Sequence, residues 1–218
     1  MKKKVIALSL FAMMLTTAGC STATPSSSSS PQATTAQNQP TDTNKKISNK
    51  LDFNTLFPNA DEKSYAQKFI GTQAPDFTLK SLDGQGVQLS KLKGQNVVLE
   101  FALTNCPACI ETFPQVEVFK ASRPDVKVFT IFPNETKQQA ELFFKQNHYK
   151  RDGQILAGEG MTTVAMNYNI TFTPTFLFVD KEGYIQFIHV GSADSQVLSS
   201  MADLAFHTNG NSPATIKK

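Results

Sequence analysis

Residues 97–114 of this 218-residue chain read VVLEFALTNCPACIETFP, and this stretch decides the fold. The run from Val97 to Leu103 is almost entirely apolar, which is typical of a β-strand covered on both faces. Two cysteines follow, and the segment from Cys106 to Ser122 reads as a helix. Its buried side is expected to carry the apolar residues Ile110, Phe113, Val116, Val118 and Phe119.

Outward from this stretch, strand and helix patterns alternate. Within 77–89, the sequence predicts two short strands around an Asp83–Gly84 turn. A second buried strand is predicted over 126–132, followed by a helix around 136–146. Towards the C-terminus, a hairpin over 175–190 that turns at 180–183 precedes a helix over 194–206. The last helix is amphipathic, with apolar Val197, Leu198, Met201 and Leu204 at helical spacing. This order predicts an α/β fold with a central mixed sheet flanked by helices.

The cysteine pair has three possible meanings: a redox pair, half of a metal site, or two buried thiols. Cys106 falls at the start of the predicted helix, where free N–H groups and the helix dipole stabilise a thiolate. The pKa of its thiol should therefore lie below the usual value of about 8.5. Pro107 fits the first helical turn, where a missing N–H costs nothing. Cys109 lies one turn deeper on the same face and is expected to be shielded.

Counting ligands argues against a metal site. A structural zinc needs four ligands, and beyond the two thiols the domain offers only His148, His189 and His207, with no paired spacing. A purely structural disulfide between positions 106 and 109 would close a tiny loop and stabilise little. Redox chemistry without a metal or an organic cofactor is therefore the favoured interpretation.

The N-terminus reads MKKKVIALSLFAMMLTTAGC and has the parts of a secretory signal. Three lysines precede an apolar run from Val5 to Leu15, which is too short to cross a membrane. The residues TTAGC resemble the lipobox of bacterial lipoproteins, although Thr17 stands where that motif commonly has Leu. The resemblance implies cleavage after residue 19 and lipidation of Cys20. The alternative is an ordinary secreted protein with a stray cysteine.

The mature chain is expected to comprise a linker and one domain. Residues 20–50 carry the lipidated cysteine and a Ser/Thr/Pro-rich tether, 51–208 form the domain, and 209–218 form a flexible tail. Removing residues 1–19 takes away three lysines, so the 21 basic residues fall to 18, equal to the 18 acidic ones. A formally neutral mature chain argues against a nucleic-acid partner.

From about Ala74 to Phe206, the chain resembles the thioredoxin-like thiol–disulfide oxidoreductases of the membrane-anchored TlpA/ResA type. The motifs are CPAC at 106–109, Pro114 in the following helix, Glu100 in the buried strand, and the TFTP segment that ends at Pro174. The resemblance implies a thioredoxin-like fold with an insertion between the second buried strand and the strand after Pro174. It also implies a redox disulfide in which Cys106 attacks and Cys109 resolves.

The resemblance assigns supporting roles as well. Thr173 and Pro174 match the loop with a cis-proline that faces the cysteines and binds the substrate backbone. Glu100 stands where thioredoxin has a buried aspartate, so two interpretations arise. A buried Glu100 would have a raised pKa and take the proton of Cys109, whereas one at an edge would simply be solvated. The chain also departs from the family at Asn105, where Trp is usual.

These observations predict a lipid-anchored, extracytoplasmic thiol–disulfide oxidoreductase that acts on thiols or disulfides of proteins. A membrane redox partner would recycle the cysteine pair. Pro107 and Thr173 resemble the residues of disulfide-forming and isomerising members of the family more than those of reductive ones, and this resemblance implies a slight preference for disulfide formation. The alternative is a reductase that serves cytochrome maturation or methionine sulfoxide repair. A peroxiredoxin-like peroxidase is disfavoured because Leu103 stands where Thr or Ser is usual, and a Sco-type copper protein would need CxxxC and a suitable histidine.

Overall fold

A computed structural model describes residues 56–57, 59–150 and 152–206. The predicted signal segment, Cys20, the linker up to residue 50, the tail at 209–218 and His207 lie outside the described residues. Within the described ranges, no helix is both long enough and apolar enough to cross a membrane.

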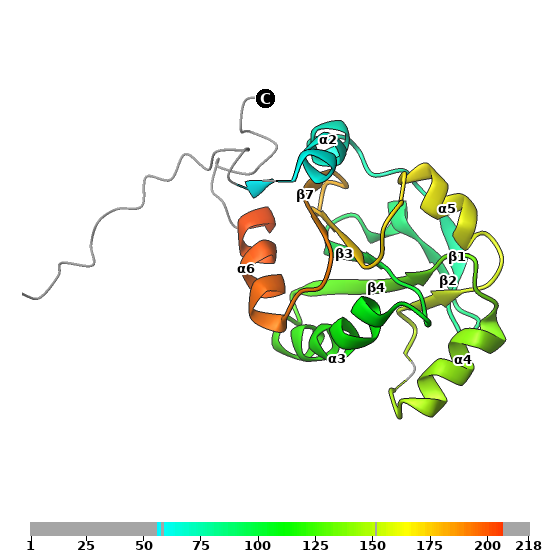
Figure 1. Ribbon diagram of the computed structural model, residues 1–218. Helices are drawn as coiled ribbons and strands as arrows, with labels where there is room; N and C mark the ends of the chain where they lie inside the picture. Colours follow the sequence, from blue (N-terminus) through cyan, green and yellow to red (C-terminus); the bar gives the residue numbers. More distant parts are fainter. Residues whose placement is uncertain (1–55, 58, 151, 207–218) are drawn as a thin grey trace, which may run out of the picture. The chain divides into compact units, whose positions relative to one another are not determined.

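Five strands form the central sheet, in the order β5–β4–β3–β6–β7. Figure 1 shows β3, β4 and β7 among the surrounding helices. Their bounds are β3 Asn96–Phe101, β4 Val126–Phe132, β5 Ile155–Ala157, β6 Thr175–Val179 and β7 Ile185–Val190. Strands β3, β4 and β5 run parallel, whereas β6 is antiparallel to β3, and β7 is antiparallel to β6. The predicted mixed sheet is confirmed. Its central strand is β3, which explains the continuous apolar run in that segment.

The helices flank both faces of this sheet. Helix α3, Pro107–Ser122, packs beside α6, Ser195–Phe206. Alternation along β3 separates the two faces. Phe101 packs against Tyr168 at the end of α5, Met161–Asn167. Glu100 points to the opposite face, where the charge of Lys120 on α3 acts on its carboxylate. Helix α2, Ala60–Phe69, joins the α5 side through a 2.7 Å hydrogen bond from the Tyr65 hydroxyl to the Tyr168 carbonyl oxygen.

The segment between β4 and β6 contains α4, Lys137–Gln146, as well as β5 and α5. This is where the family resemblance places an insertion. Helix α4 begins with a capping box, in which the Thr136 side chain and Gln139 satisfy each other's backbone N–H groups. Its Phe143 and Phe144 pack edge-on against Phe113 of α3. The insertion therefore covers one side of the helix that carries the cysteines.

A small hairpin precedes the sheet. Strands β1, Thr78–Lys80, and β2, Gly86–Gln88, pair antiparallel and lead into a 3-10 turn at Leu89–Leu92. Gly84 adopts a φ of 83°, a conformation that favours glycine. The predicted turn at Asp83–Gly84 is thus confirmed.

The predicted buried side of α3 is only partly right. Phe113, Val116 and Phe119 are buried, but Ile110 is 38% exposed and Val118 is 53% exposed. At about 100° per residue, Val118 lies opposite the buried stripe and Ile110 lies at its margin. On α6, Leu198 is buried whereas Val197 is 39% exposed, for the same geometric reason.

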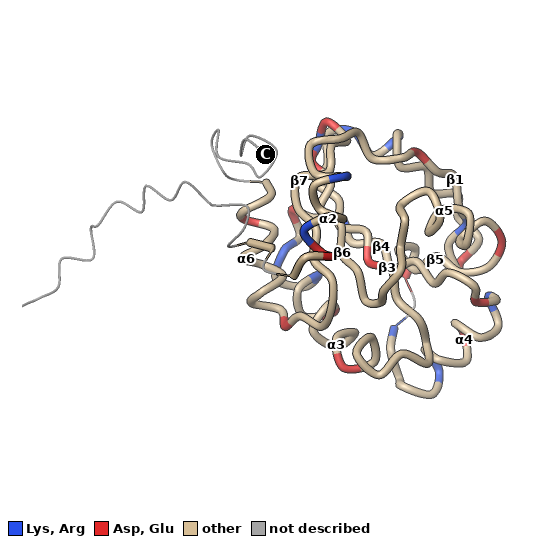
Figure 2. Tube along the Cα trace, turned by 45° about the horizontal axis from the view of Figure 1, so that its top comes forward, with Lys and Arg blue, Asp and Glu red and all other residues tan. Residues whose placement is uncertain are grey.

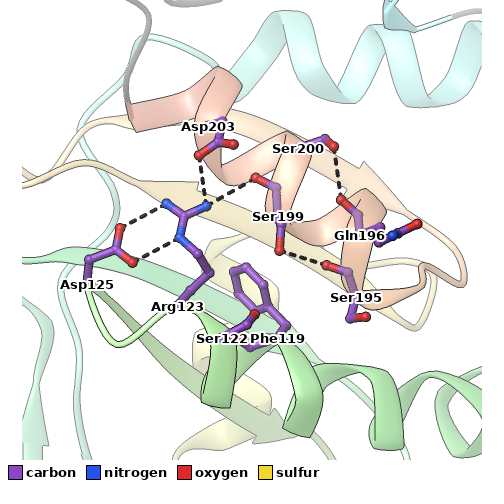
Figure 3. Close-up of polar contacts among 9 residues, drawn as sticks. All are labelled: Phe119, Ser122, Arg123, Asp125, Ser195, Gln196, Ser199, Ser200 and Asp203. Atoms are coloured by element: carbon purple, nitrogen blue, oxygen red, sulfur yellow. Dashed lines mark hydrogen bonds and ion pairs between the residues drawn. The ribbon is translucent and has the colours of Figure 1, made fainter.

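Arg123 ties the end of α3 to α6 (Figure 3). Its guanidinium donates two hydrogen bonds of 2.9 Å to the Asp125 carboxylate. A third bond of 2.9 Å reaches Asp203 on α6, and a fourth of 3.3 Å reaches the Ser199 carbonyl oxygen. These bonds fix the end of the helix that lies farthest from the cysteines.

Candidate active site

Cys106 occupies the N-cap of α3, as the sequence predicts. Its sulfur accepts a hydrogen bond from the Cys109 backbone N–H at 3.4 Å, and Pro107 fills the first helical position. The Cys106 side chain is partly exposed, whereas Cys109 is only 3% exposed. The two thiols are free, so the structure represents the dithiol form. One thiol is therefore accessible and its neighbour is shielded.

The two thiols differ in acidity as well as in exposure. Burial acts to raise the pKa of Cys106, but hydrogen bonds with the Cys109 thiol, with Thr173 and with backbone N–H groups outweigh it and lower the pKa. Burial raises the pKa of Cys109, and its hydrogen bond to Cys106 raises it further. Because a thiolate is the attacking form, the arrangement favours Cys106 as the nucleophile.

The loop before β6 faces the nucleophile. The Thr173–Pro174 peptide bond is cis, as the family resemblance implies. The Cys106 thiol donates a hydrogen bond to the Thr173 carbonyl oxygen at 3.4 Å. The Pro174 carbonyl oxygen accepts a 2.8 Å bond from the Gly191 N–H, and the Thr175 hydroxyl donates a 2.7 Å bond to the Phe172 carbonyl oxygen. The loop is therefore held on both sides while it borders the reactive sulfur.

Glu100 is fully buried in the central strand β3. The alternative in which it lies solvated at an edge is wrong, because β3 is paired on both sides. One carboxylate oxygen, Oε2, accepts a 2.6 Å hydrogen bond from the Thr130 hydroxyl. Among the described residues, Oε1 has no hydrogen-bond partner. Burial raises the pKa of Glu100 to about 7, although Thr130 and the charge of Lys120 act in the opposite direction.

Glu135 is a second buried carboxylate near the cysteine motif, and the sequence interpretation missed it. Its Oε1 accepts bonds from the Thr104 N–H at 2.6 Å and from the Thr104 hydroxyl at 2.9 Å. It thus holds the loop that leads into Cys106. A signal was available, because Glu135 comes just after β4, and the carboxyl ends of parallel β3 and β4 share one edge of the sheet.

The rim of the site differs from the family pattern. Asn105 is exposed where the family usually has Trp. On the loop with the cis-proline, Phe172 is 61% exposed and stands one residue before Thr173. The sequence interpretation did not single out Phe172, since an aromatic residue beside a predicted strand usually indicates packing.

His189 makes contacts away from the sulfurs. Its Nδ1 lies 3.8 Å from Glu62 Oε1, its Nε2 lies 3.3 Å from the Ser192 carbonyl oxygen, and its ring stacks on Phe176. No group of three or more His, Cys, Asp or Glu side chains able to hold a metal occurs in the described ranges.

Known proteins share this architecture. The family model named Redoxin matches residues 69–204. The chain is 30% identical over 148 residues to the thioredoxin-like protein YneN of Bacillus subtilis, an overlap of 65% of this chain and 86% of YneN. It is 26% identical over 136 residues to the thiol-disulfide oxidoreductase ResA of Halalkalibacterium halodurans, an overlap of 62% and 76%. The solved structure of the exposed lipoprotein thioredoxin Etrx1 of Streptococcus pneumoniae aligns with a TM-score of 0.51 and 23% identity, over 59% of this chain and 98% of Etrx1.

Proposed function

This chain belongs to the Redoxin family and has the thioredoxin-like fold of the thiol–disulfide oxidoreductases, and we propose that it exchanges disulfides with proteins through Cys106 and Cys109. One observation carries the proposal. The partly exposed Cys106 thiol, whose pKa is lowered, donates to the Thr173 carbonyl oxygen at 3.4 Å, next to the cis-proline. A substrate backbone that pairs with this loop would bring its own sulfur to Cys106.

The reaction proceeds by two exchanges of sulfur partners. The Cys106 thiolate attacks one sulfur of a substrate disulfide, that S–S bond breaks, and the other substrate sulfur leaves as a thiolate. Cys109 then loses its proton and attacks Cys106 Sγ, which releases the second substrate thiolate. The products are a Cys106–Cys109 disulfide and a substrate reduced by two electrons. Run in reverse, the same steps oxidise a substrate dithiol.

Glu100 serves as the base for the second exchange in this proposal. Its pKa of about 7 allows it to take up and give back a proton near neutral pH, and a buried thiol needs such a base because its own pKa is raised. Oε1 of Glu100, which has no partner among the described residues, is free to accept a hydrogen bond.

We favour disulfide formation as the physiological direction. The lowered pKa of Cys106 stabilises the reduced form of the pair, and proteins with a stabilised reduced form are strong oxidants. Reduction of substrates is the alternative. A reduction potential measured in glutathione buffers separates the two: a value near that of DsbA, about −120 mV, supports oxidation, and one near that of thioredoxin, about −270 mV, supports reduction.

The lipobox-like TTAGC segment supports an anchored, extracytoplasmic enzyme that a membrane redox partner recycles. Cys20→Ala should abolish lipid labelling of the chain in cells and leave thiol–disulfide exchange by the purified protein intact. Loss of exchange in this variant would contradict the separation of anchor from chemistry.

Trapping tests the assignment of roles. Cys109→Ala should accumulate a mixed disulfide between Cys106 and a substrate, because the resolving thiol is gone. Cys106→Ala should accumulate none, and serves as the matched control. Equal trapping by both variants, or trapping by Cys106→Ala alone, would overturn the proposal.

A further inference from the structure

A cavity of about 260 Å³ lies beside the loop with the cis-proline. We name it the α2 pocket, after the helix that forms one of its walls. The lining residues on which the argument rests are Asp61, Glu62, Tyr65, Ile170, Phe172 and Val190. The start of α2 lies next to the end of β7 (Figures 1 and 2), and both elements contribute residues to the pocket, as does the segment that leads to the cis-proline.

The α2 pocket begins one residue from the reactive centre. Phe172, which precedes the Thr173 carbonyl in contact with Cys106, lines the pocket and is 61% exposed. A polypeptide that pairs with Thr173 would therefore extend past this pocket within two or three residues of its reacting cysteine. The volume falls below the range of about 300–1,000 Å³ typical of pockets for small molecules, so a single side chain suits it better.

The chemistry of the walls selects the kind of side chain. Tyr65, Ile170 and Val190 contribute apolar surface, whereas Asp61 and Glu62 contribute negative charge. No Lys or Arg occurs among the described residues that line the pocket. A long cationic side chain matches this combination, because lysine and arginine bury an apolar stem and keep a charged head. The exposed Phe172 ring adds a surface on which a cation can lie.

Contacts within the protein fix the Glu62 carboxylate and the start of α2. Glu62 Oε1 accepts a 3.2 Å hydrogen bond from the Val190 N–H and lies 3.8 Å from Nδ1 of His189. The Asn59 side chain caps the start of α2 by accepting bonds from the Asp61 and Glu62 N–H groups at 2.9 and 3.3 Å. The Glu62 carboxylate and the backbone of both acidic residues are thus held beside the loop in the absence of any substrate, whereas the Asp61 side chain is exposed.

We infer that the α2 pocket binds a lysine or arginine side chain two or three residues from the reacting cysteine of a substrate protein, an inference that rests on the proposed exchange at Cys106. Selectivity would then come from charge as well as from backbone pairing. The family motif around the cysteines carries no such information, since Asp61 and Glu62 lie outside it.

Activated peptides test this inference. Each peptide carries one cysteine as a mixed disulfide with thionitrobenzoate, and lysine, glutamate or leucine two residues before or two residues after it. The reduced full chain is mixed with each peptide at low salt, and thionitrobenzoate release gives the rate. Lysine at one of the two positions should react roughly tenfold faster than glutamate, and the ratio should shrink at high salt.

Variants locate the selectivity. Asp61→Asn combined with Glu62→Gln should bring the lysine-to-glutamate ratio close to one, and Phe172→Ala should slow the lysine peptide several-fold. The matched control is Asp83→Asn combined with Glu182→Gln, which removes the same charge from exposed turns and should keep the ratio. Equal wild-type rates for lysine and glutamate, a faster leucine peptide, or an unchanged ratio in the pocket variant would overturn the inference. Absence of reaction with every peptide would instead overturn the proposed function.

Discussion

The side of the cysteine motif that faces the core, here called the inner side, differs in exposure from the side that faces solvent, here called the outer side. On the inner side, Cys109 is 3% exposed and Glu100 is fully buried, and both lie on regular elements of the core. On the outer side, Cys106 meets a loop, an exposed Asn105 and a Phe172 ring that is 61% exposed. Under the proposed function, the buried groups set protonation and rate, whereas the exposed loop residues set which protein is bound. Changes on the inner side should therefore slow every substrate alike, and changes on the outer side should alter the balance between substrates.

The largest effect on the inner side is expected from Glu100→Gln. Glutamine keeps the shape of the side chain but cannot accept the proton of Cys109. A general base is typically worth about a hundredfold or more, so turnover near neutral pH should fall by that factor for all substrates. Accumulation of mixed disulfide in quenched samples measures the blocked step. Turnover equal to that of the wild type would remove Glu100 from the mechanism.

The same residue should make stability depend on pH. The pKa of Glu100 is about 7 in the folded protein and near 4.5 in the unfolded chain. Between these values the folded state binds more protons than the unfolded state, so the free energy of unfolding falls as pH rises from about 4.5 to 7. Over this pH range, the free energy of unfolding should fall by on the order of 3 kcal/mol. Above pH 7 the loss persists.

Urea unfolding of the dithiol form at pH 5 and pH 8 measures this dependence. Glu100→Gln should reduce the fall in stability between the two pH values, whereas the exposed control Glu182→Gln should keep it. An identical fall in the wild type and in Glu100→Gln would show that Glu100 carries no such penalty.

On the outer side, Asn105→Trp should act on binding alone. An exposed aromatic ring next to Cys106 offers a substrate additional apolar contact, worth about 1 kcal/mol, or roughly a fivefold lower KM for a peptide disulfide. The pH profile that belongs to Glu100 should not move, because the two residues lie on opposite sides of the motif. A shift of that profile would break the division between the inner and outer sides.

The smallest effect is expected far from both sides, at Arg123→Ala. The variant loses the bonds to Asp125 and Asp203 that hold the end of α3 against α6 (Figure 3). Asp203 is 65% exposed, and ion pairs of this kind contribute about 1 kcal/mol or less. Urea unfolding should show that modest loss, with exchange rates as in the wild type. A large loss of activity would mean that the position of α3 depends on its far end.

The inner side was predictable from the sequence because burial leaves a pattern. The apolar run around Glu100 and the spacing of Cys106 and Cys109 were sufficient for the central strand and the helix that follows it. The cis peptide bond at Pro174 was predicted only through the family resemblance of the TFTP segment. Helices α2 and α5 and the short strand β5 were not predicted. In α2 only Ala66 and Phe69 are buried, which gives too few apolar positions for a helical pattern.

The outer side left weaker signals. Phe172 stands beside a predicted strand, where an aromatic residue usually packs into the core, yet the structure shows it exposed. Asp61 and Glu62 lie in a helix that the sequence did not predict. For Ile110 and Val118 the error was the opposite one. Their apolar character predicted that they would be buried on α3, but both are exposed because of their positions around the helix. The local sequence pattern predicts burial well. The set of exposed groups around a loop depends instead on contacts between residues about a hundred or more positions apart, such as the hydrogen bond between Glu62 and Val190.

The asymmetry between the two thiols is the central claim, and one measurement tests it directly. The reduced full chain is alkylated briefly with iodoacetamide at pH 6, and mass spectrometry quantifies the label on each cysteine. Because the pKa of Cys106 is lowered and that of Cys109 is raised by burial, the label that these two cysteines carry should be almost entirely on Cys106. Equal labelling, or preferential labelling of Cys109, would contradict the assignment of Cys106 as the attacking thiol.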